Sequence, residues 1–295
     1  MKTGYPCINR TVHCPGNKTF RLKSYSEDKL KETIDNNLNC LRNMLEFNVA
    51  HDLLFFRIGS DMVPFASHPV CEFSWQTEFS EKFRAMGGFI KEHGFRISMH
   101  PDQFVLINAK DIRIFQRSVK ELIYHAQALD MMGLDQTAKI QIHVGGVYND
   151  KAGSIRRFIE RYHSLDDVIK KRLVIENDHR SYSLKDCMAI HKETNIPIVF
   201  DSLHHRVLNN GESMEAALKE FFPTWGPTDG APMVDYSSQK PDAKKGNHAL
   251  SIDMDDFSDF LSGAGALDFD IMLEIKDKEA SALKAIERIR QVRQA

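Results

Sequence analysis

The chain has 295 residues, of which 42% are hydrophobic and 27% charged, a globular composition that excludes disordered, collagen-like and membrane-embedded chains. Lysine and arginine number 39 and aspartate and glutamate 41, so a formal net charge of -2 supplies no overall positive field for nucleic acid or anionic lipid. Any polyanionic partner must be held by a local patch or by metal ions.

The five cysteines are odd in number and lack CxxC spacing, which favours a reduced chain in the cytoplasm. The N-terminus has no charged-then-apolar signal pattern, and no apolar run approaches the ~18 residues of a membrane span. We expect a cytoplasmic protein without a membrane partner, working as a monomer.

Eight short runs of β-branched or aromatic residues recur along the chain, each followed by a helical pattern. Most runs lack polar alternation, as is typical of parallel strands that are buried on both faces. The expected strands are residues 4–9, 53–58, 96–100, 139–144, 172–176, 196–201, 232–237 and 270–275.

Helical spacing of apolar residues fills the intervals between these runs. The first helix is expected after a capping box at Ser24 and Glu27, with apolar positions at 30, 34, 38, 41 and 45. Further helices are expected over residues 78–93, 112–132, 154–170, 183–194 and 279–292. The alternation predicts one α/β domain over residues 1–295, a (β/α)8 TIM barrel. A doubly wound sheet of six to eight strands is the alternative.

The active site of such a barrel lies at the C-terminal ends of its strands, and here those ends carry metal-ligand side chains. They are His100, His143, Glu176, Asp201, Asp235 and Glu274, with His204 and His248 following strands six and seven. A single strand-end histidine or aspartate is more often a structural group. Together, so many carboxylates would repel one another unless divalent cations compensated them.

A multinuclear metal site is therefore expected at the barrel mouth. Mixed histidine and carboxylate ligands favour Mn²⁺, Zn²⁺ or Fe²⁺ over Ca²⁺. Two or three such ions commonly promote attack on a phosphodiester. A sugar isomerase uses similar ligands to shift a hydride, so the pattern alone leaves both reactions open.

Seven motifs, in order along the chain, resemble the UV-damage endonuclease family. They are GYPCIN at residues 4–9, FRIGSD at 56–61, SMHP at 98–101, IHVGG at 142–146, IEND at 175–178, FDSLHH at 200–205 and LEIKDKE at 273–279. The resemblance covers residues 1–280. It implies a metal-dependent TIM barrel that binds double-stranded DNA and nicks it immediately 5′ of UV photoproducts such as pyrimidine dimers.

The same resemblance implies a ligand set for two or three ions, with Mn²⁺ as the metal. His100, His143 and Glu176 would hold one ion, Glu176, Asp201, Asp235 and Glu274 a second, and His204 and His248 would face a third. Glu176 and Glu274 would be catalytic through the metals, and Lys276 would reach the scissile phosphate. Relatives carry Lys-x-His on strand seven, where this chain has Met233 and Asp235, so the third ion lacks a carboxylated lysine.

Lesion recognition is implied for residues in the loops around the mouth. Gln103 and Phe104 would probe the lesion from inside the helix, where an aromatic face replaces lost base stacking. Family members can have tyrosine at the position of Phe104, so a phenolic hydrogen bond is lost. Tyr5, Asn9 and His68 match residues that line the lesion pocket.

Affinity for DNA comes largely from phosphate contacts, so positive loops must outweigh the carboxylates locally. Candidate phosphate contacts are Lys244 and Lys245, together with Arg10 and Lys240, in the loops after strands one and seven.

Overall fold

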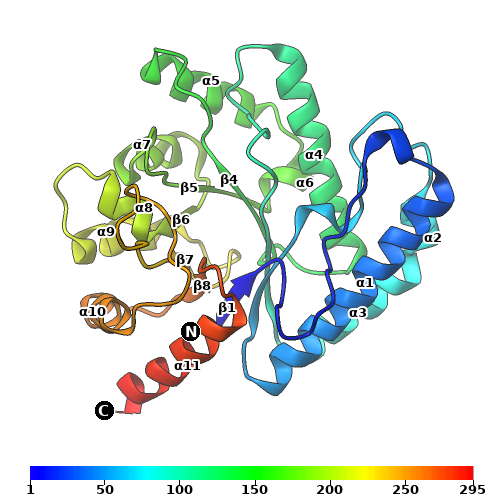
Figure 1. Cartoon of the computed structure of the whole chain (residues 1–295). Helices are drawn as coiled ribbons and strands as arrows, with labels where there is room; N and C mark the ends of the chain where they lie inside the picture. Colours follow the sequence, from blue (N-terminus) through cyan, green and yellow to red (C-terminus); the bar gives the residue numbers. More distant parts are fainter. Residues whose placement is uncertain (295) are drawn as a thin grey trace.

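The computed structural model describes residues 1–294 and shows a closed barrel of parallel strands surrounded by helices (Figure 1). Neighbouring strands pair in chain order, and β8 closes on β1 with Thr3 opposite Ile271. The strands are β1 (Thr3–Pro6), β2 (Phe55–Ile58), β3 (Arg96–Met99), β4 (Lys139–His143), β5 (Leu173–Glu176), β6 (Ile198–Asp201), β7 (Met233–Tyr236) and β8 (Asp270–Leu273). Each overlaps one predicted run, so the predicted TIM barrel is confirmed.

Helices cover the outside of the barrel and return the chain from one strand to the next. They are α1 (Glu27–Ala50), α2 (Trp75–Glu78), α3 (Ser80–Glu92), α4 (Ile112–Met131), α5 (Lys151–His163), α6 (Asp167–Lys170), α7 (Leu184–Thr194), α8 (Ser202–Val207), α9 (Met214–Phe221), α10 (Met254–Ala264) and α11 (Glu279–Gln294). Short 3₁₀ turns lie at η1 (Leu22–Ser24), η2 (Ser60–Met62) and η3 (Phe222–Thr224).

Helix α1 shows how the sequence positions these elements. Its five predicted apolar positions are all buried against the barrel, and each fully buried leucine or isoleucine stabilises the fold by about 1.5–3 kcal/mol. The predicted capping box is wrong in register, because Ser24 lies in η1 and Ser26 caps the helix by accepting a hydrogen bond from the Lys29 amide. Helix α8 was not predicted from apolar spacing. It has only six residues, too few to show a helical repeat, and it starts directly after Asp201, the last residue of β6.

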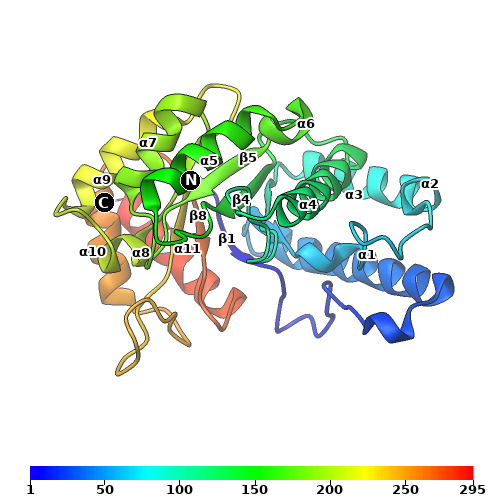
Figure 2. The same cartoon turned by 90° about the horizontal axis from the view of Figure 1, so that it is seen from above.

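The register of the strands brings their C-terminal ends to one edge of the barrel. His143 of β4 is opposite Glu176 of β5, and Asp201 of β6 is opposite Asp235 of β7. The loops after β1 and β7 project from the same side of the barrel (Figure 2). This edge is the barrel mouth, the end that faces the viewer in Figure 1.

The expectation of five reduced cysteines is wrong, because Cys14 and Cys40 form a disulfide. The loop after β1 packs beside α1, which brings the two Cα atoms within 5.2 Å. A separation of 26 residues carries no local motif, so the spacing could not reveal the pair. Cys7, Cys71 and Cys187 are free thiols. Within residues 1–294, no helix has both the length and the apolar character needed to cross a membrane.

Candidate metal centre at the barrel mouth

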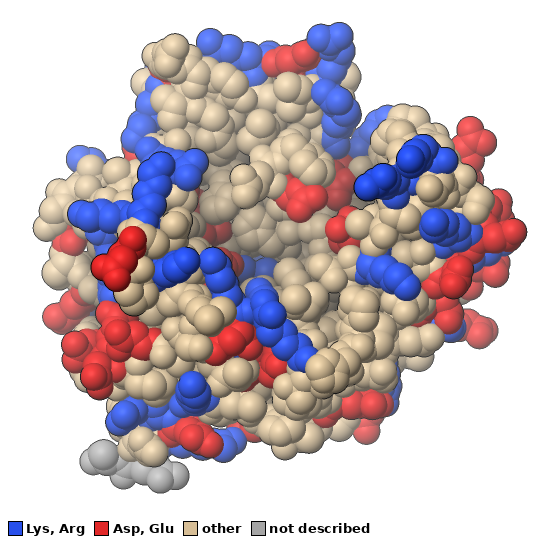
Figure 3. Space-filling model, viewed as in Figure 1, with Lys and Arg blue, Asp and Glu red and all other residues tan. Residues whose placement is uncertain are grey.

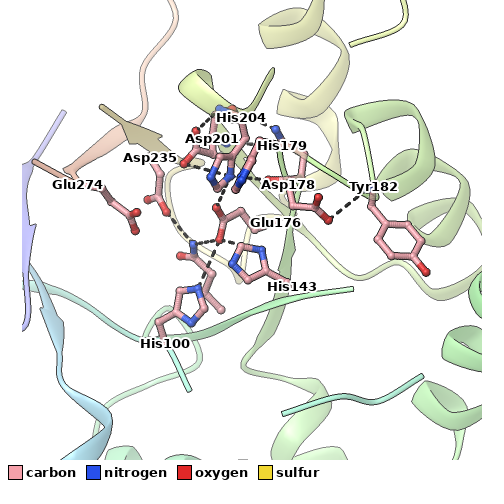
Figure 4. Close-up of polar contacts among 12 residues, drawn as sticks. His100, His143, Glu176, Asp178, His179, Tyr182, Asp201, His204, Asp235 and Glu274 are labelled. Carbon is pink, nitrogen blue, oxygen red and sulfur yellow. Dashed lines mark hydrogen bonds and ion pairs between the residues drawn. The ribbon is translucent and has the colours of Figure 1, made fainter. Parts of the chain in front are cut away.

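Most of the predicted metal ligands converge at the barrel mouth. Glu176 lies at the centre of the cluster, with His100 and His143 on one side and His204 on the other (Figure 4). Three groups have ligand atoms within 4.8 Å of one another: a first group of His100, His143 and Glu176, a second of Glu176, Asp201 and His204, and a third of Asp201, Asp235 and Glu274. Because Glu176 and Asp201 each belong to two groups, the seven side chains form one continuous cluster.

In the first group, two imidazole rings approach one carboxylate oxygen. His100 Nδ1 donates a hydrogen bond to the Pro101 carbonyl oxygen at 2.8 Å, which leaves the lone pair of the neutral ring on Nε2. This Nε2 lies 3.5 Å from Glu176 Oε2, and His143 Nδ1 lies 3.6 Å from the same oxygen. Metal bonds to nitrogen and oxygen are about 2.0–2.2 Å for Zn²⁺, so atoms at these separations can share one ion.

The second group is set by the start of helix α8. Asp201 Oδ1 accepts the backbone N–H of His204 at 2.7 Å, which fixes the carboxylate at the helix N-terminus. His204 Nδ1 lies 3.1 Å from Glu176 Oε1 and 3.4 Å from Asp201 Oδ2. Glu176 therefore directs one oxygen to the first group and the other to the second, which is the arrangement of a carboxylate that bridges two ions.

The third group already contains a positive charge from the barrel interior. Arg57 of β2 places its Nη2 2.7 Å from Asp235 Oδ1, and its Nη1 forms an ion pair with Glu274. Arg57 is 1% exposed. The third group therefore differs from the other two, in which histidines are the only basic side chains.

Electrostatics at the mouth are dominated by buried carboxylates. Burial raises the pKa of Asp235 to about 7, although the positive charge of Arg57 opposes the rise. Burial also raises the pKa of Asp201 well above its usual value, with Glu176 and Glu274 adding repulsion. Burial lowers the pKa of His204, but Asp201 and Glu176 outweigh it and raise the value to about 11. Carboxylates outnumber the permanent cation here, so a bound cation would stabilise the cluster.

The donor set fits divalent metal ions. Among residues 1–294, no hydrogen-bond partner is found for the buried atoms His143 Nδ1 and Asp201 Oδ2, which costs free energy unless an ion completes their coordination. Imidazole and carboxylate together suit Mn²⁺, Zn²⁺ and Fe²⁺. The buried histidine and carboxylate cluster at the mouth can hold metal ions.

Two residues predicted to bind metal or to act in catalysis, His248 and Lys276, lie outside the three groups. His248 donates from Nδ1 to the Glu274 carbonyl oxygen at 2.6 Å, and its ring centre is 6.2 Å from that of His204. Lys276 is exposed, and its backbone N–H donates to Ala249. Metal binding by His248 and phosphate contact by Lys276 stay predictions.

The predicted lesion-contacting residues divide into exposed and buried sets. Gln103 and Phe104 are exposed in the loop after β3, and Phe104 keeps 64% of its surface in solvent. Tyr5 and Asn9 are buried, with Asn9 Nδ2 donating to Tyr5 Oη at 2.7 Å, and Tyr5 Oη donates in turn to Asn48. His68 is exposed. A direct lesion contact by Tyr5 or Asn9 stays a prediction, because both lie below the surface.

The predicted phosphate contacts Arg10, Lys240, Lys244 and Lys245 are all exposed. The face seen in Figure 3 is hollowed at its centre, with lysine and arginine side chains along parts of the rim. Acidic side chains lie beside the hollow (Figure 3). A positively charged rim next to acidic metal ligands is compatible with a polyanion whose backbone reaches the metals.

The sequence analysis missed Arg57 and Gln141, two polar side chains inside the barrel. Arg57 Nη2 donates to Gln141 Oε1 at 2.7 Å, and Gln141 Nε2 donates to Glu176 Oε2 at 2.6 Å. The available signal was an arginine within the buried run of β2 and a glutamine within that of β4. A polar side chain in a strand buried on both faces is informative, because its burial requires a partner.

The fold and the cluster define a TIM barrel that can hold several metal ions around a central carboxylate at its mouth. The chain belongs to the UV-endonuclease UvdE family, because the sequence model of that family matches residues 1–295. The family inferred from the seven motifs is thereby confirmed.

Similar proteins align with nearly the whole chain. A UV DNA damage endonuclease of Clostridium perfringens is 39% identical over 294 residues, which span 99% of this chain and 71% of that protein. The crystal structure of SacUVDE is 45% identical in sequence, the match covers 100% of both chains, and the two structures superimpose with a TM-score of 0.95. A D-psicose 3-epimerase from Clostridium cellulolyticum H10 has a TM-score of 0.57 and 12% identity over 85% of this chain and 93% of that one, a likeness of fold alone.

Proposed function

We propose that this protein is a metal-dependent DNA repair endonuclease that recognises UV photoproducts, including pyrimidine dimers, and cleaves the phosphodiester bond immediately 5′ to the lesion. The observation that carries the proposal is Glu176, which joins two groups of potential ligands in a chain of the UV-endonuclease family. The exposed pair Gln103 and Phe104 supports it from the neighbouring loop. The enzyme acts as a monomer in the cytoplasm.

The predicted ligands would hold two or three divalent ions, with Mn²⁺ the preferred metal. When bound, such ions supply Lewis-acid charge for a phosphate and activate water near neutral pH. His100 donates from Nδ1 to the Pro101 carbonyl oxygen, which fixes the direction of its free Nε2. His204 Nδ1 lies 3.0 Å from the Asn177 carbonyl oxygen, which holds that ring in place. Within residues 1–294, His143 Nδ1 has no hydrogen-bond partner.

Recognition uses the loop after β3. Turning a damaged nucleotide out of the duplex has a modest cost because a photodimer is already poorly paired. Phe104 fills the gap by stacking through its ring face, and Gln103 offers an amide to the exposed base edges. Lys244 and Lys245 hold the backbone, which places the phosphate 5′ of the lesion over the metal ligands.

The deciding experiment compares UV-irradiated and untreated duplexes incubated with Mn²⁺ or with a chelator. We expect nicking only of the irradiated duplex and only with metal. Equal nicking of both duplexes, or none, would contradict lesion-specific cleavage, and metal-independent binding without nicking would indicate a catalytically silent DNA-binding protein. Turnover of a free sugar by the metal-loaded protein would instead indicate an isomerase.

The cleavage position needs a duplex with one pyrimidine dimer at a defined site. End-labelling of the damaged strand and separation at single-nucleotide resolution should give a single product that ends in a 3′-hydroxyl immediately 5′ of the dimer. The same duplex without the dimer is the matched control. A nick on the 3′ side, or several positions, would contradict the proposed incision.

A further inference from the structure

Arg57 contacts two of the candidate metal ligands, Asp235 and Glu274, from inside the barrel. Its guanidinium lies inside the barrel, where Nη2 donates to both oxygens of Asp235 at 2.7 and 2.9 Å. Nη1 forms the ion pair with Glu274 Oε1. At 1% exposure the side chain lies too deep to touch DNA, so any role in the reaction must act through other residues.

Gln141 extends these contacts to the centre of the cluster. Its Oε1 accepts from Arg57 at 2.7 Å, and its Nε2 donates at 2.6 Å to Glu176 and to Asp235. Arg57 and Gln141 therefore form a polar layer beneath the ligands. Through this layer the positive charge of Arg57 orients three of the four carboxylates at the mouth.

The third group is consequently the one in which a cation is already present. A guanidinium cannot lose its proton in a protein, so Arg57 is a permanent charge. It engages both oxygens of Asp235 and one oxygen of Glu274, which are two of the three members of that group. A divalent ion bound to the same oxygens would compete with it and be repelled by it.

We propose that Arg57 is the resident cation of the group formed by Asp201, Asp235 and Glu274, so that Asp235 is its counter-ion rather than a metal ligand. The mouth then binds two divalent ions, one in each group that contains Glu176. Glu274 keeps its second oxygen available to those ions. Arg57 is a positioning residue, and this proposal rests on the metal dependence of the proposed function.

The experiment counts Mn²⁺ ions on the intact protein without DNA, by equilibrium dialysis and elemental analysis, and measures their dissociation constants by titration calorimetry. The wild type should bind two ions. Asp235→Asn should also bind two, with dissociation constants within about threefold of the wild type, because a counter-ion is not a ligand. Arg57→Met should bind a third ion, because the oxygens of Asp235 and Glu274 then lack a cation.

Two controls separate charge from general disruption. Arg57→Lys keeps the positive charge and should keep the count at two. Arg172→Met removes an arginine that is equally buried at the opposite end of the barrel, and should leave the count at two. In the double variant Arg57→Met with Asp235→Asn, one carboxylate is removed with the arginine, so the third ion should be lost again.

A third ion in the wild type, one ion fewer in Asp235→Asn, or a count of two in Arg57→Met would each overturn the proposal. If Arg57→Met does not fold, the counts for Asp235→Asn and Arg57→Lys still decide it. The result is independent of nuclease activity. A protein that binds two ions and leaves UV-irradiated DNA intact would refute the proposed function and retain the role of Arg57.

Discussion

Charged side chains are buried at both ends of this barrel, but they are compensated in different ways. At the end where the strands begin, Arg172 is 1% exposed and pairs with Asp130. Its remaining donors reach the backbone carbonyl oxygens of Leu134, Asp135 and Ala138. Lys139 similarly pairs with Asp229 and donates to the carbonyl oxygen of Lys171. Each of these two cations has one carboxylate and additional oxygen acceptors.

At the mouth the balance is reversed. Glu176, Asp201, Asp235 and Glu274 converge, and Arg57 is the permanent cation among them. Two buried ligand atoms, His143 Nδ1 and Asp201 Oδ2, have no hydrogen-bond partner in the part of the chain that the structure describes. Paired charge therefore stabilises the end where the strands begin, whereas carboxylates in excess of their cations make the mouth the end suited to bind a cation.

Substitution of Glu176 should have the greatest effect on activity, because this carboxylate belongs to two of the three ligand groups. Glu176→Gln removes the charge that two ligand groups share, and a neutral amide bridges cations poorly. Nicking of UV-irradiated duplex should fall at least about 10³-fold, which corresponds to about 4 kcal/mol. Binding to damaged DNA, measured by fluorescence anisotropy with chelator present, should change little. Full Mn²⁺ occupancy with near-normal nicking would move the catalytic assignment elsewhere in the mouth.

Arg172→Met tests the opposite end. Asp130 is 37% exposed and keeps Lys171 as a partner, so the loss comes mainly from the carbonyl oxygens of Leu134 and Ala138, each of which loses a buried donor at about 1–3 kcal/mol. Urea unfolding should show this loss of stability, whereas the Mn²⁺ content of the folded protein should equal that of the wild type. A variant of unchanged stability that has lost metal would contradict the division between a structural end and a binding end.

His125 of α4 is a buried imidazole outside the mouth, and its nearest paired carboxylate is that of Glu121 at 3.6 Å. Burial lowers its pKa to about 4. The unfolded chain binds this proton near pH 6.5, so the stability contribution is complete above pH 6.5 and is lost as the pH falls toward 4. Linkage puts the loss at up to about 3 kcal/mol. His125→Leu should therefore flatten the dependence of unfolding free energy on pH between 6.5 and 4, and an unchanged slope would contradict it.

The sequence predicts the barrel because each strand is a short apolar run that needs no knowledge of its partners. It also places candidate ligands at strand ends, and seven of the eight fall into the three groups, while His248 lies outside. The contact between Arg57 and Asp235 could not be predicted, because these residues are 178 positions apart and meet only when the barrel closes. The Cys14–Cys40 disulfide was missed for the same reason.

Within the mouth, ligand binding and lesion recognition are carried by different loops, and the double variant Gln103→Ala with Phe104→Ala separates them. Stacking of a base on an aromatic ring contributes about 1–3 kcal/mol, so the preference for damaged over undamaged duplex should fall about tenfold. Metal content should stay intact. Gln291→Ala with Val292→Ala, a similar exposed pair on α11, is the matched control and should keep the preference. Equal loss in both double variants would contradict lesion recognition by the loop after β3.

The barrel has a pair of consecutive lysines at each end, and replacing either pair should have the smallest effect on DNA binding. Lys244 and Lys245 are exposed in the loop after β7 at the mouth, whereas Lys170 and Lys171 lie at the opposite end and pair with Asp167 and Asp130. A phosphate contact releases counterions, so replacing the first pair with alanine should lower the slope of log affinity against log salt by about 2. Damaged and undamaged duplexes should weaken alike, because phosphate contacts carry no information about the lesion.

Replacing Lys170 and Lys171 with alanine should leave both affinities and the salt slope unchanged, because that pair faces away from the mouth and its charges are partly neutralised by neighbouring carboxylates. Binding is measured by anisotropy across a range of salt concentrations. A loss confined to damaged DNA would assign Lys244 and Lys245 to the lesion itself. Equal slopes for the two double variants would show that the positive rim of the mouth does not follow the DNA backbone, and the duplex would then have to be held by the metal ions and the loop after β3.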